Sequence, residues 1–243
     1  MKEHLKIGLI GYGRMGKKIE ELCEATEAVV VFAIDRHNLE EMRPELLKSA
    51  DVALEFTHPE SAPRNLIACF DAGVPVVTGT TGWNDQLPDI LEACKSRQGG
   101  LFYASNFSIG VNLLFRINRL LSSWAHLKYG YSASIREVHH VHKRDAPSGT
   151  ALSLAGDILN ASDQYSAWSM KSVSKDNELR IESIREGEVP GIHEVRFSSQ
   201  VDELTIRHEA FSREGFALGA LAAARFMAGK TGVYGMDDLL NEG

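Results

Sequence analysis

The chain has 243 residues, of which 44% are hydrophobic and 24% are charged, a composition typical of a globular protein with one large core or two smaller ones. Its formal net charge of −7 argues against general nucleic-acid binding, which depends on clustered Lys and Arg. The longest stretch without a charged side chain, residues 98–115, contains too many Gly, Ser and Asn residues to span a membrane. We therefore expect a protein that acts on small molecules, with no nucleic-acid or membrane partner.

The N-terminus and the cysteines indicate a cellular compartment. Residues 1–4 lead directly into an apolar run and carry neither a secretory nor a transit signal, so we expect a cytoplasmic location. The three cysteines, Cys23, Cys69 and Cys94, are odd in number and widely spaced. Each lies in a helical apolar pattern, which predicts reduced, buried thiols rather than disulfides or a metal knuckle.

Short apolar runs alternate with helical patterns over the first 107 residues. The runs that we expect to form buried parallel strands are residues 5–10, 28–34, 52–56, 74–77 and 101–104. The patterns that we expect to form helices are residues 14–25, 39–48, 61–72 and 84–97. This alternation predicts an α/β fold, a Rossmann-like doubly wound parallel sheet.

A glycine-rich turn follows the first expected strand and opens a helix. Its sequence, Gly11-Tyr12-Gly13-Arg14-Met15-Gly16, has the form G-x-G-x-x-G. Gly11 permits a tight turn, Gly13 leaves room for a pyrophosphate to approach the backbone, and Gly16 allows close packing of helix and strand. In this context the motif predicts a dinucleotide-binding site, and a turn that serves only packing is the alternative.

The residues that end the second strand bear on the choice of dinucleotide. Asp35 follows Gly16 by nineteen residues and can accept hydrogen bonds from the adenine ribose, as in NAD sites. A guanidinium from Arg36, with Arg14 nearby, can hold the 2′-phosphate of NADP. The pair predicts tolerance of both NADH and NADPH, although Arg36 could equally be a solvated loop charge.

Two further loops lie at the carboxyl ends of expected strands, where ligands bind in open α/β sheets. They are Gly79-Thr80-Thr81-Gly82 and Ala104-Ser105-Asn106-Phe107. Small residues with hydroxyl or amide groups are suited to lining a nicotinamide and its ribose, and their position favours this interpretation over ordinary turns.

The pattern changes after residue 110. We expect helices at residues 111–124 and 216–228, the second of them packing back on the first half, and a loop at residues 162–177. Residues 134–140, 179–185, 193–199 and 203–210 alternate with a period of two. They predict an α+β domain whose mixed or antiparallel sheet has one face on a core and one face free.

The densest polar cluster runs from Glu137 to Ala151, leaves a strand, makes a Pro-marked turn and enters a helix. Ser148, Gly149 and Thr150 offer free backbone N–H groups at that helix start, and Lys143 adds a positive charge, so the cluster predicts a carboxylate-bearing ligand. The three histidines and the aspartate also allow a metal site or a purely structural role. Because Lys143 and Arg144 oppose a divalent cation, we expect no metal.

At these residues the chain resembles the dihydrodipicolinate reductase family, also called 4-hydroxy-tetrahydrodipicolinate reductase, of the diaminopimelate route to lysine. The resemblance rests on Glu-x-His-His-x-x-Lys-x-Asp-Ala-Pro-Ser-Gly-Thr-Ala from Glu137, on the Gly-Thr-Thr-Gly loop, on Ala-x-Asn-Phe-Ser from Ala104 and on the Gly-Arg-Met-Gly turn. These motifs occur in the family's order and extend over nearly the whole chain.

The resemblance implies a role for each matching residue. It makes His139 the acid-base residue, Lys143 a second proton donor and carboxylate partner, and His140, Ser148, Gly149 and Thr150 substrate contacts. It makes the cofactor-binding residues Gly11, Tyr12, Gly13, Arg14, Met15, Gly16, Asp35, Arg36, Gly79, Thr80, Thr81, Ala104, Ser105, Asn106 and Phe107. A nicotinamide hydride would then reduce a cyclic dicarboxylate, with NADH or NADPH as the cofactor.

The resemblance also implies an architecture. Residues 1–107 and 213–243 would form the dinucleotide-binding domain, and residues 108–212 the substrate-binding and oligomerisation domain of a homotetramer. The glycine turn is one residue shorter than the family's commonest form, and the segment after Asp35 is abbreviated, which leaves the preference between NADH and NADPH open. Residues 190–194 depart from the family's Gly-Glu-His, so His193 receives no role.

Two other functions remain open at this point. A related two-domain amino- or imino-acid dehydrogenase would share the plan but not the paired-carboxylate site at Lys143 and Ser148. A non-catalytic NAD(P)H sensor would bind the dinucleotide and ignore a dicarboxylate.

Overall fold

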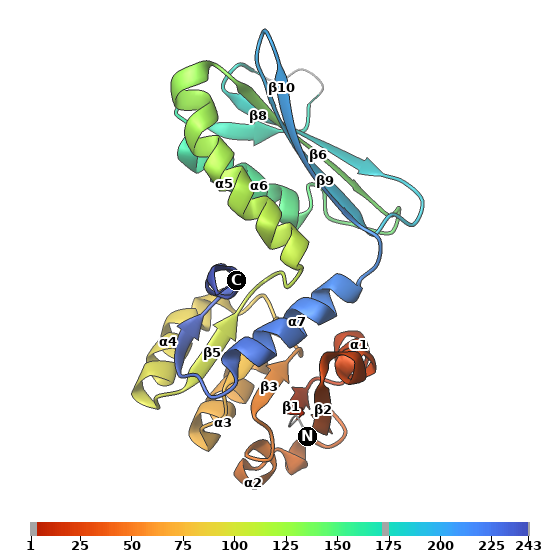
Figure 1. The fold of residues 1–243 in the computed structure, drawn as a ribbon, viewed down its shortest axis with the longest axis vertical. Coiled ribbons are helices and arrows are strands. Elements are labelled where there is room, and N and C mark those ends of the chain that lie inside the picture. The colour runs from red at the N-terminus through yellow and green to blue at the C-terminus, as the bar shows by residue number, and fades with distance from the viewer. Residues whose placement is uncertain (1–3, 172–174, 243) are drawn as a thin grey trace. The chain divides into compact units, whose positions relative to one another are not determined.

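A computed structural model describes residues 4–171 and 175–242, without the side chains of residues 125–129. The chain divides into two compact units (Figure 1). Unit 1 comprises Met1–Ile109 and Glu214–Gly243, and unit 2 comprises Gly110–Arg213. Unit 2 is thus an insertion into unit 1.

Unit 1 contains a six-stranded sheet of order β11-β5-β4-β3-β1-β2. The strands are β1 (Leu5–Ile10), β2 (Ala28–Ile34), β3 (Val52–Glu55), β4 (Val76–Thr78), β5 (Gly100–Tyr103) and β11 (Gly232–Tyr234). Every pairing is parallel, and the order reverses between β1 and β3. This confirms the predicted doubly wound sheet and places all the loops that follow its strands at one edge.

Helices cover both faces of this sheet. They are α1 (Arg14–Cys23), α2 (Pro44–Leu47), α3 (Ala62–Ala72), α4 (Leu87–Ser96), α7 (Glu214–Met227) and α8 (Met236–Asn241). The core on one face includes Ile19 of α1 and Ala220 of α7, and the core on the other includes Leu66 of α3 and Ile90 of α4. The small residues of α7 let this helix pack closely against the segment after β5, because a Cβ at Gly219 would lie 1.7 Å from the backbone oxygen of Phe107.

Two expectations about local structure are wrong. The helix expected at residues 39–48 is a 3₁₀ turn at Leu39–Glu41 followed by the single turn of α2, because Pro44 has no N–H to continue a helix and begins a new one instead. The loop expected at residues 162–177 contains strand β7 (Ala167–Ser169), which is too short to give a period-two pattern. Residues 172–174 of that loop lie outside the described residues.

Unit 2 has a five-stranded mixed sheet of order β10-β9-β6-β8-β7. Its other strands are β6 (Ser132–His139), β8 (Glu178–Arg185), β9 (Gly191–Ser198) and β10 (Glu203–Ala210). Strand β9 is antiparallel to β6 and β10, whereas β8 is parallel to β6 and β7. The helices α5 (Ile109–Tyr129) and α6 (Gly149–Ala161) contribute Leu114 and Leu154 to a core with Ile135, Ile181 and Phe197.

The opposite face of the unit 2 sheet is largely charged. It carries the ion pairs Arg136–Glu182 and Glu194–Arg196, with nitrogen-to-oxygen distances of 3.7 and 2.6 Å. The alternation along β6 and β9 that predicted one core face and one polar face is therefore confirmed.

The described residues bear out the expectation for the cysteines, because all three are free and buried. Within residues 4–171 and 175–242, no helix combines the length and the apolar character that a membrane span requires.

Candidate functional site

The glycine turn after β1 has the backbone geometry that a dinucleotide requires. Gly11 has a φ of +101°, and a Cβ there would lie 2.1 Å from the carbonyl oxygen of Phe56. A Cβ at Gly16 would lie 2.5 Å from the Gly11 oxygen, whereas a Cβ at Gly13 would have no atom within 4 Å. Gly13 is the N-cap of α1 and supplies no side-chain cap, so no capping side chain takes up the N–H groups of the first turn. This geometry fits a bound pyrophosphate.

Asp35 lies beside this turn. The Gly11 N–H donates to the Ile34 oxygen at 2.8 Å, which aligns the ends of β1 and β2. The Asp35 carboxylate accepts from the His37 N–H at 2.7 Å and is thereby oriented at the sheet edge. Arg36 is exposed and donates through Nε to His37 at 3.0 Å.

The loops after β3, β4 and β5 are packed together at the same edge. The Thr57 N–H donates to Thr80 Oγ1 at 2.8 Å, and Trp83 Nε1 donates to the Thr80 oxygen at 2.6 Å. A Cβ at Gly79 would lie 2.2 Å from the ring of Phe56 and 2.9 Å from that of Phe107. Phe107 of the second predicted cofactor loop forms an aromatic pair with Phe56, which follows β3, and Gly79 of the first loop lies against both rings.

A buried carboxylate that the sequence analysis did not single out supports these loops. Glu55, at the end of β3, has no exposed surface. It accepts hydrogen bonds from Thr57 Oγ1 and, at 2.6 Å, from Thr78 Oγ1, while Asn65 Nδ2 lies 3.4 Å away. Thr57 follows β3 and Thr78 ends β4, so Glu55 holds the ends of these two strands, and the loops that follow them, at a fixed distance from each other.

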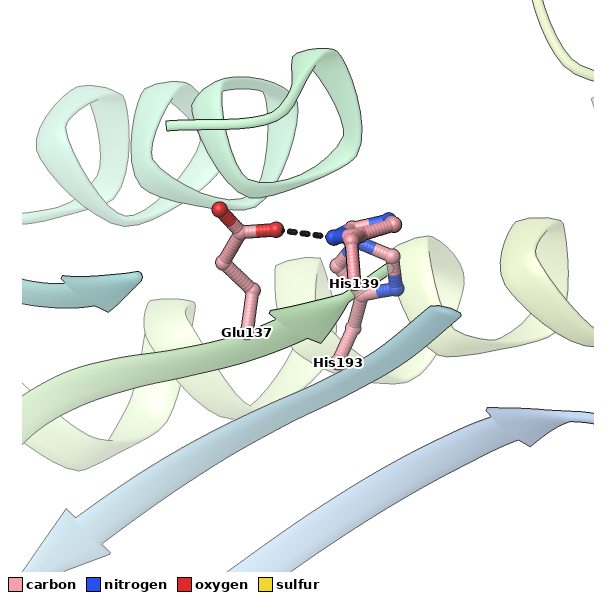
Figure 2. Close-up of side chains that lie close together, drawn as sticks. All are labelled: Glu137, His139 and His193. Atoms are coloured by element: carbon pink, nitrogen blue, oxygen red, sulfur yellow. Dashed lines mark ion pairs between the residues drawn. The ribbon is translucent and has the colours of Figure 1, made fainter. Parts of the chain in front are cut away.

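In unit 2, the end of β6 brings two titratable groups together (Figure 2). The Glu137 carboxylate forms an ion pair with Nδ1 of His139, although the two atoms are not aligned as in a hydrogen bond. Glu137 is fully buried, and the ring of His139 is almost so. His193 on β9 pairs with Glu137 in the sheet register, and its ring centroid lies 5.0 Å from that of His139.

The start of α6 is attached to the same carboxylate. The Ser148 N–H donates to Glu137 Oε1 at 3.3 Å, and Arg185 on β8 donates to the same oxygen at 3.0 Å. Ser148 caps α6 by accepting from the Ala151 N–H, and its hydroxyl lies 3.2 Å from Nε2 of His193. The acid-base candidate and the predicted anion site therefore share one set of contacts. The expectation that the Ser148 N–H is free for an anion is wrong, because the Glu137 carboxylate already accepts from it.

The surroundings perturb the ionisation of this cluster. Burial alone would raise the pKa of Glu137, but its interactions with His139, Ser183 and Arg185 outweigh burial and lower the pKa to about 2. Burial, followed by the electrostatic effect of His139, lowers the pKa of His193 to about 3. At neutral pH Glu137 is therefore ionised and His193 is neutral.

The remaining predicted substrate contacts lie in the turn between β6 and α6. Lys143 Nζ lies 2.9 Å from an Asp145 carboxylate oxygen, and this contact lowers the pKa of Asp145. The His140 N–H donates to the Val189 oxygen at 2.8 Å. Gly149 and Thr150 form the first turn of α6, and a Cβ at Gly149 would meet no atom within 4 Å.

Glu137, His139 and His193 also place potential metal ligands within 4.8 Å of one another. The Arg185 guanidinium already neutralises the Glu137 carboxylate, and a divalent cation would have to compete with it. Lys143 and Arg144 are the positive charges on which the expectation of no metal rests, and Arg185 adds a further opposing charge. The absence of a metal remains a prediction.

Comparison with known proteins identifies the family. The family model described as dihydrodipicolinate reductase, N-terminus, matches residues 5–107, and that of its C-terminus matches residues 110–240. The chain belongs to the dihydrodipicolinate reductase family. It is therefore an oxidoreductase, and the resemblance seen in the sequence is confirmed.

Relatives support the assignment over the full length. The chain is 40% identical over 242 residues to the 4-hydroxy-tetrahydrodipicolinate reductase of Christiangramia forsetii, with 98% of each chain covered. It is 35% identical to that of Caldanaerobacter subterraneus, with 95% of this chain and 96% of the relative covered. The dihydrodipicolinate reductase of Paenisporosarcina, solved with dipicolinate bound, shares the fold with a TM-score of 0.80 and 22% identity, covering 97% of this chain and 99% of that one.

The predicted site residues of this dihydrodipicolinate reductase family member fall into two groups. The expected cofactor residues lie at one edge of the unit 1 sheet, and the expected substrate and acid-base residues lie around the start of α6 in unit 2. Three further residues contact the second group. The sequence pattern included Glu137 and His193 without a role, and it did not single out Arg185. The period-two pattern of β9 could have indicated His193, because it places this polar residue on the core face with Val195 and Phe197.

Proposed function

We propose that this chain reduces 4-hydroxy-tetrahydrodipicolinate to tetrahydrodipicolinate with NADH or NADPH, in the diaminopimelate route to lysine. The observation that carries the proposal is the contact of His139 with Glu137, the residue that also binds the start of α6. An ionisable imidazole beside an anion-binding helix start is suited to reducing a small dicarboxylate. Family membership and the names of the relatives support the same reaction.

Residues 1–107 and 213–243 would bind the cofactor. The N–H groups of the first turn of α1 would receive the pyrophosphate, Asp35 the adenine ribose, and Arg14 and Arg36 the 2′-phosphate of NADPH. The loops after β4 and β5 would line the nicotinamide side. The complete proposed set is Gly11, Tyr12, Gly13, Arg14, Met15, Gly16, Asp35, Arg36, Gly79, Thr80, Thr81, Ala104, Ser105, Asn106 and Phe107.

Residues 108–212 would bind the substrate. His140, Ser148, Gly149 and Thr150 would hold its carboxylates, with Lys143 as the cationic partner. The 4-hydroxyl group of the substrate must first leave as water, which gives a dihydrodipicolinate ring. When bound, the reduced nicotinamide would supply a hydride to this ring. His139 would deliver a proton to the adjacent ring carbon, and Lys143, after leaving Asp145, would serve as a second donor.

The same proposal covers assembly and location. The charged face of the unit 2 sheet, with Glu194 almost buried between Arg196 and Arg207, is suited to an interface between copies, and we place the contacts of a homotetramer there. We expect a cytoplasmic enzyme without nucleic-acid or membrane partners.

A coupled assay tests the function. The purified protein should oxidise NADH or NADPH only when the condensation product of pyruvate and aspartate semialdehyde is supplied. His139→Ala should reduce turnover far more than cofactor binding, whereas the control His142→Ala, at an exposed position, should change neither. Turnover of a different amino or imino acid would identify the related dehydrogenase. Thermal stabilisation by NADPH but not by pyridine-2,6-dicarboxylate would identify a sensor.

A further inference from the structure

We propose that Glu137 is a positioning residue that sets the tautomer of His139 and ties its ring to the substrate-binding start of α6. The inference rests on the proposed function of His139 as the proton donor. Glu137 is the first residue of the motif that ends at Ala151, and the sequence pattern gave it no role.

The two oxygens of the Glu137 carboxylate have different partners. Oε2 forms the ion pair with Nδ1 of His139. Oε1 accepts from the Ser148 N–H at 3.3 Å and from Arg185 at 3.0 Å. One rigid, fully buried group therefore contacts both the proton donor and the first turn of α6.

The charge of Glu137 is compensated inside the protein. A buried carboxylate without a partner is costly in free energy, and Arg185 supplies the opposite charge here. The same guanidinium also donates to the backbone oxygen of Asp145 at 2.5 Å. Because Arg185 holds the turn through Asp145 as well, Glu137 belongs to a network that fixes the whole path from β6 to α6.

The chemical consequence concerns the tautomer of His139. An ionised carboxylate only accepts hydrogen bonds, so a neutral imidazole beside it carries its hydrogen on Nδ1. Nε2 is then the atom that takes up and returns the catalytic proton. Gly191 keeps the space beside this atom open, because a Cβ there would lie 3.1 Å from Nε2.

Glu137→Gln isolates this role because it preserves the size of the side chain. The amide oxygen can still accept from Ser148 and Arg185, but the amide nitrogen donates toward His139 and forces the imidazole hydrogen onto Nε2. We expect kcat to fall about 100-fold or more, as wrong-tautomer variants of acid-base histidines do, with cofactor affinity unchanged. Glu137→Asp retains a carboxylate and should recover part of the loss.

The decisive readout is the tautomer itself, measured by ¹⁵N NMR of the imidazole in a pH series, at a pH where the spectrum shows the neutral ring. The wild type and Glu137→Asp should carry the hydrogen on Nδ1, and Glu137→Gln on Nε2. Glu178→Gln, a carboxylate at the surface of unit 2 paired with Lys175 at 4.0 Å, is the matched control and should change neither the tautomer nor kcat.

Several outcomes would overturn the proposal. A folded Glu137→Gln variant with kcat within about threefold of the wild type contradicts it, as does an unchanged tautomer. If Glu137→Gln does not fold, an Nε2–H tautomer in the wild type still refutes it. A wild-type protein that does not reduce the proposed substrate refutes the function instead, and the NMR measurement then decides the role of Glu137 alone.

Discussion

The buried neutral His193 should make the protein less stable in mild acid. Its ring is 4% exposed, and burial lowers its pKa from 6.5 to about 3. Below pH 6.5 the unfolded chain binds a proton at His193 that the folded chain does not bind, so folding free energy is lost as the pH falls from 6.5 toward 3. With these two values, His193 alone removes about 2 kcal/mol between pH 7 and pH 5.

The assay compares urea unfolding of the wild type and His193→Gln at both pH values. Glutamine can still contact the Ser148 hydroxyl but does not titrate. The wild type should lose about 2 kcal/mol more than the variant on going from pH 7 to pH 5, because groups that titrate in both proteins cancel in the difference. Equal losses in the two proteins would refute a neutral His193 in the fold.

Four further predictions concern the glycine positions and the histidine cluster described above. Gly13→Ala should leave the melting temperature unchanged, because the added methyl group meets no protein atom within 4 Å. It should weaken NADPH binding at least about tenfold in a fluorescence titration, because the methyl group occupies space that the pyrophosphate needs. Gly11→Ala should weaken NADPH binding and, unlike Gly13→Ala, should also lower the melting temperature, since its Cβ would overlap the Phe56 oxygen. Gly191→Ala should displace the His139 ring by a few tenths of an ångström and reduce kcat by about tenfold in steady-state kinetics, with cofactor affinity retained. Treatment with EDTA should leave turnover unchanged, and a loss restored by zinc would instead assign a metal to the histidine cluster.

The sequence predicts unit 1 well because its signals are local. Each of the first five strands is a short apolar run, and β1, β2 and their connecting helix fall within a few residues of the expected bounds. Strand β11 has no such signal, because its three residues are half-buried or exposed and it forms only through pairing with β5. The alternation within β6, β8, β9 and β10 likewise predicts the sheet of unit 2, but it does not give the strand order, which depends on contacts between distant residues.

The candidate site could be predicted only in part. The motif from Glu137 to Ala151 indicates which segment binds an anion, because a polar cluster at a helix start is recognisable without a structure. The partners from other strands are not recognisable in this way. Arg185 lies on β8 and His193 on β9, and only the parallel and antiparallel registers bring them to Glu137. Glu55 in unit 1 is hidden for the same reason, because its partner Thr78 belongs to a different strand.

The return of the chain to unit 1 after residue 213 affects how the protein folds during its synthesis. The core on one face of the parallel sheet includes Ala217, Ala224 and Met227, which the ribosome adds after the whole of unit 2. Until then Leu9 and Val77 have no helix α7 to cover them, whereas the sheet of unit 2 already has all of its strands. The segment made later can therefore fold first, while the nascent first half still has apolar surface that α7 has not covered.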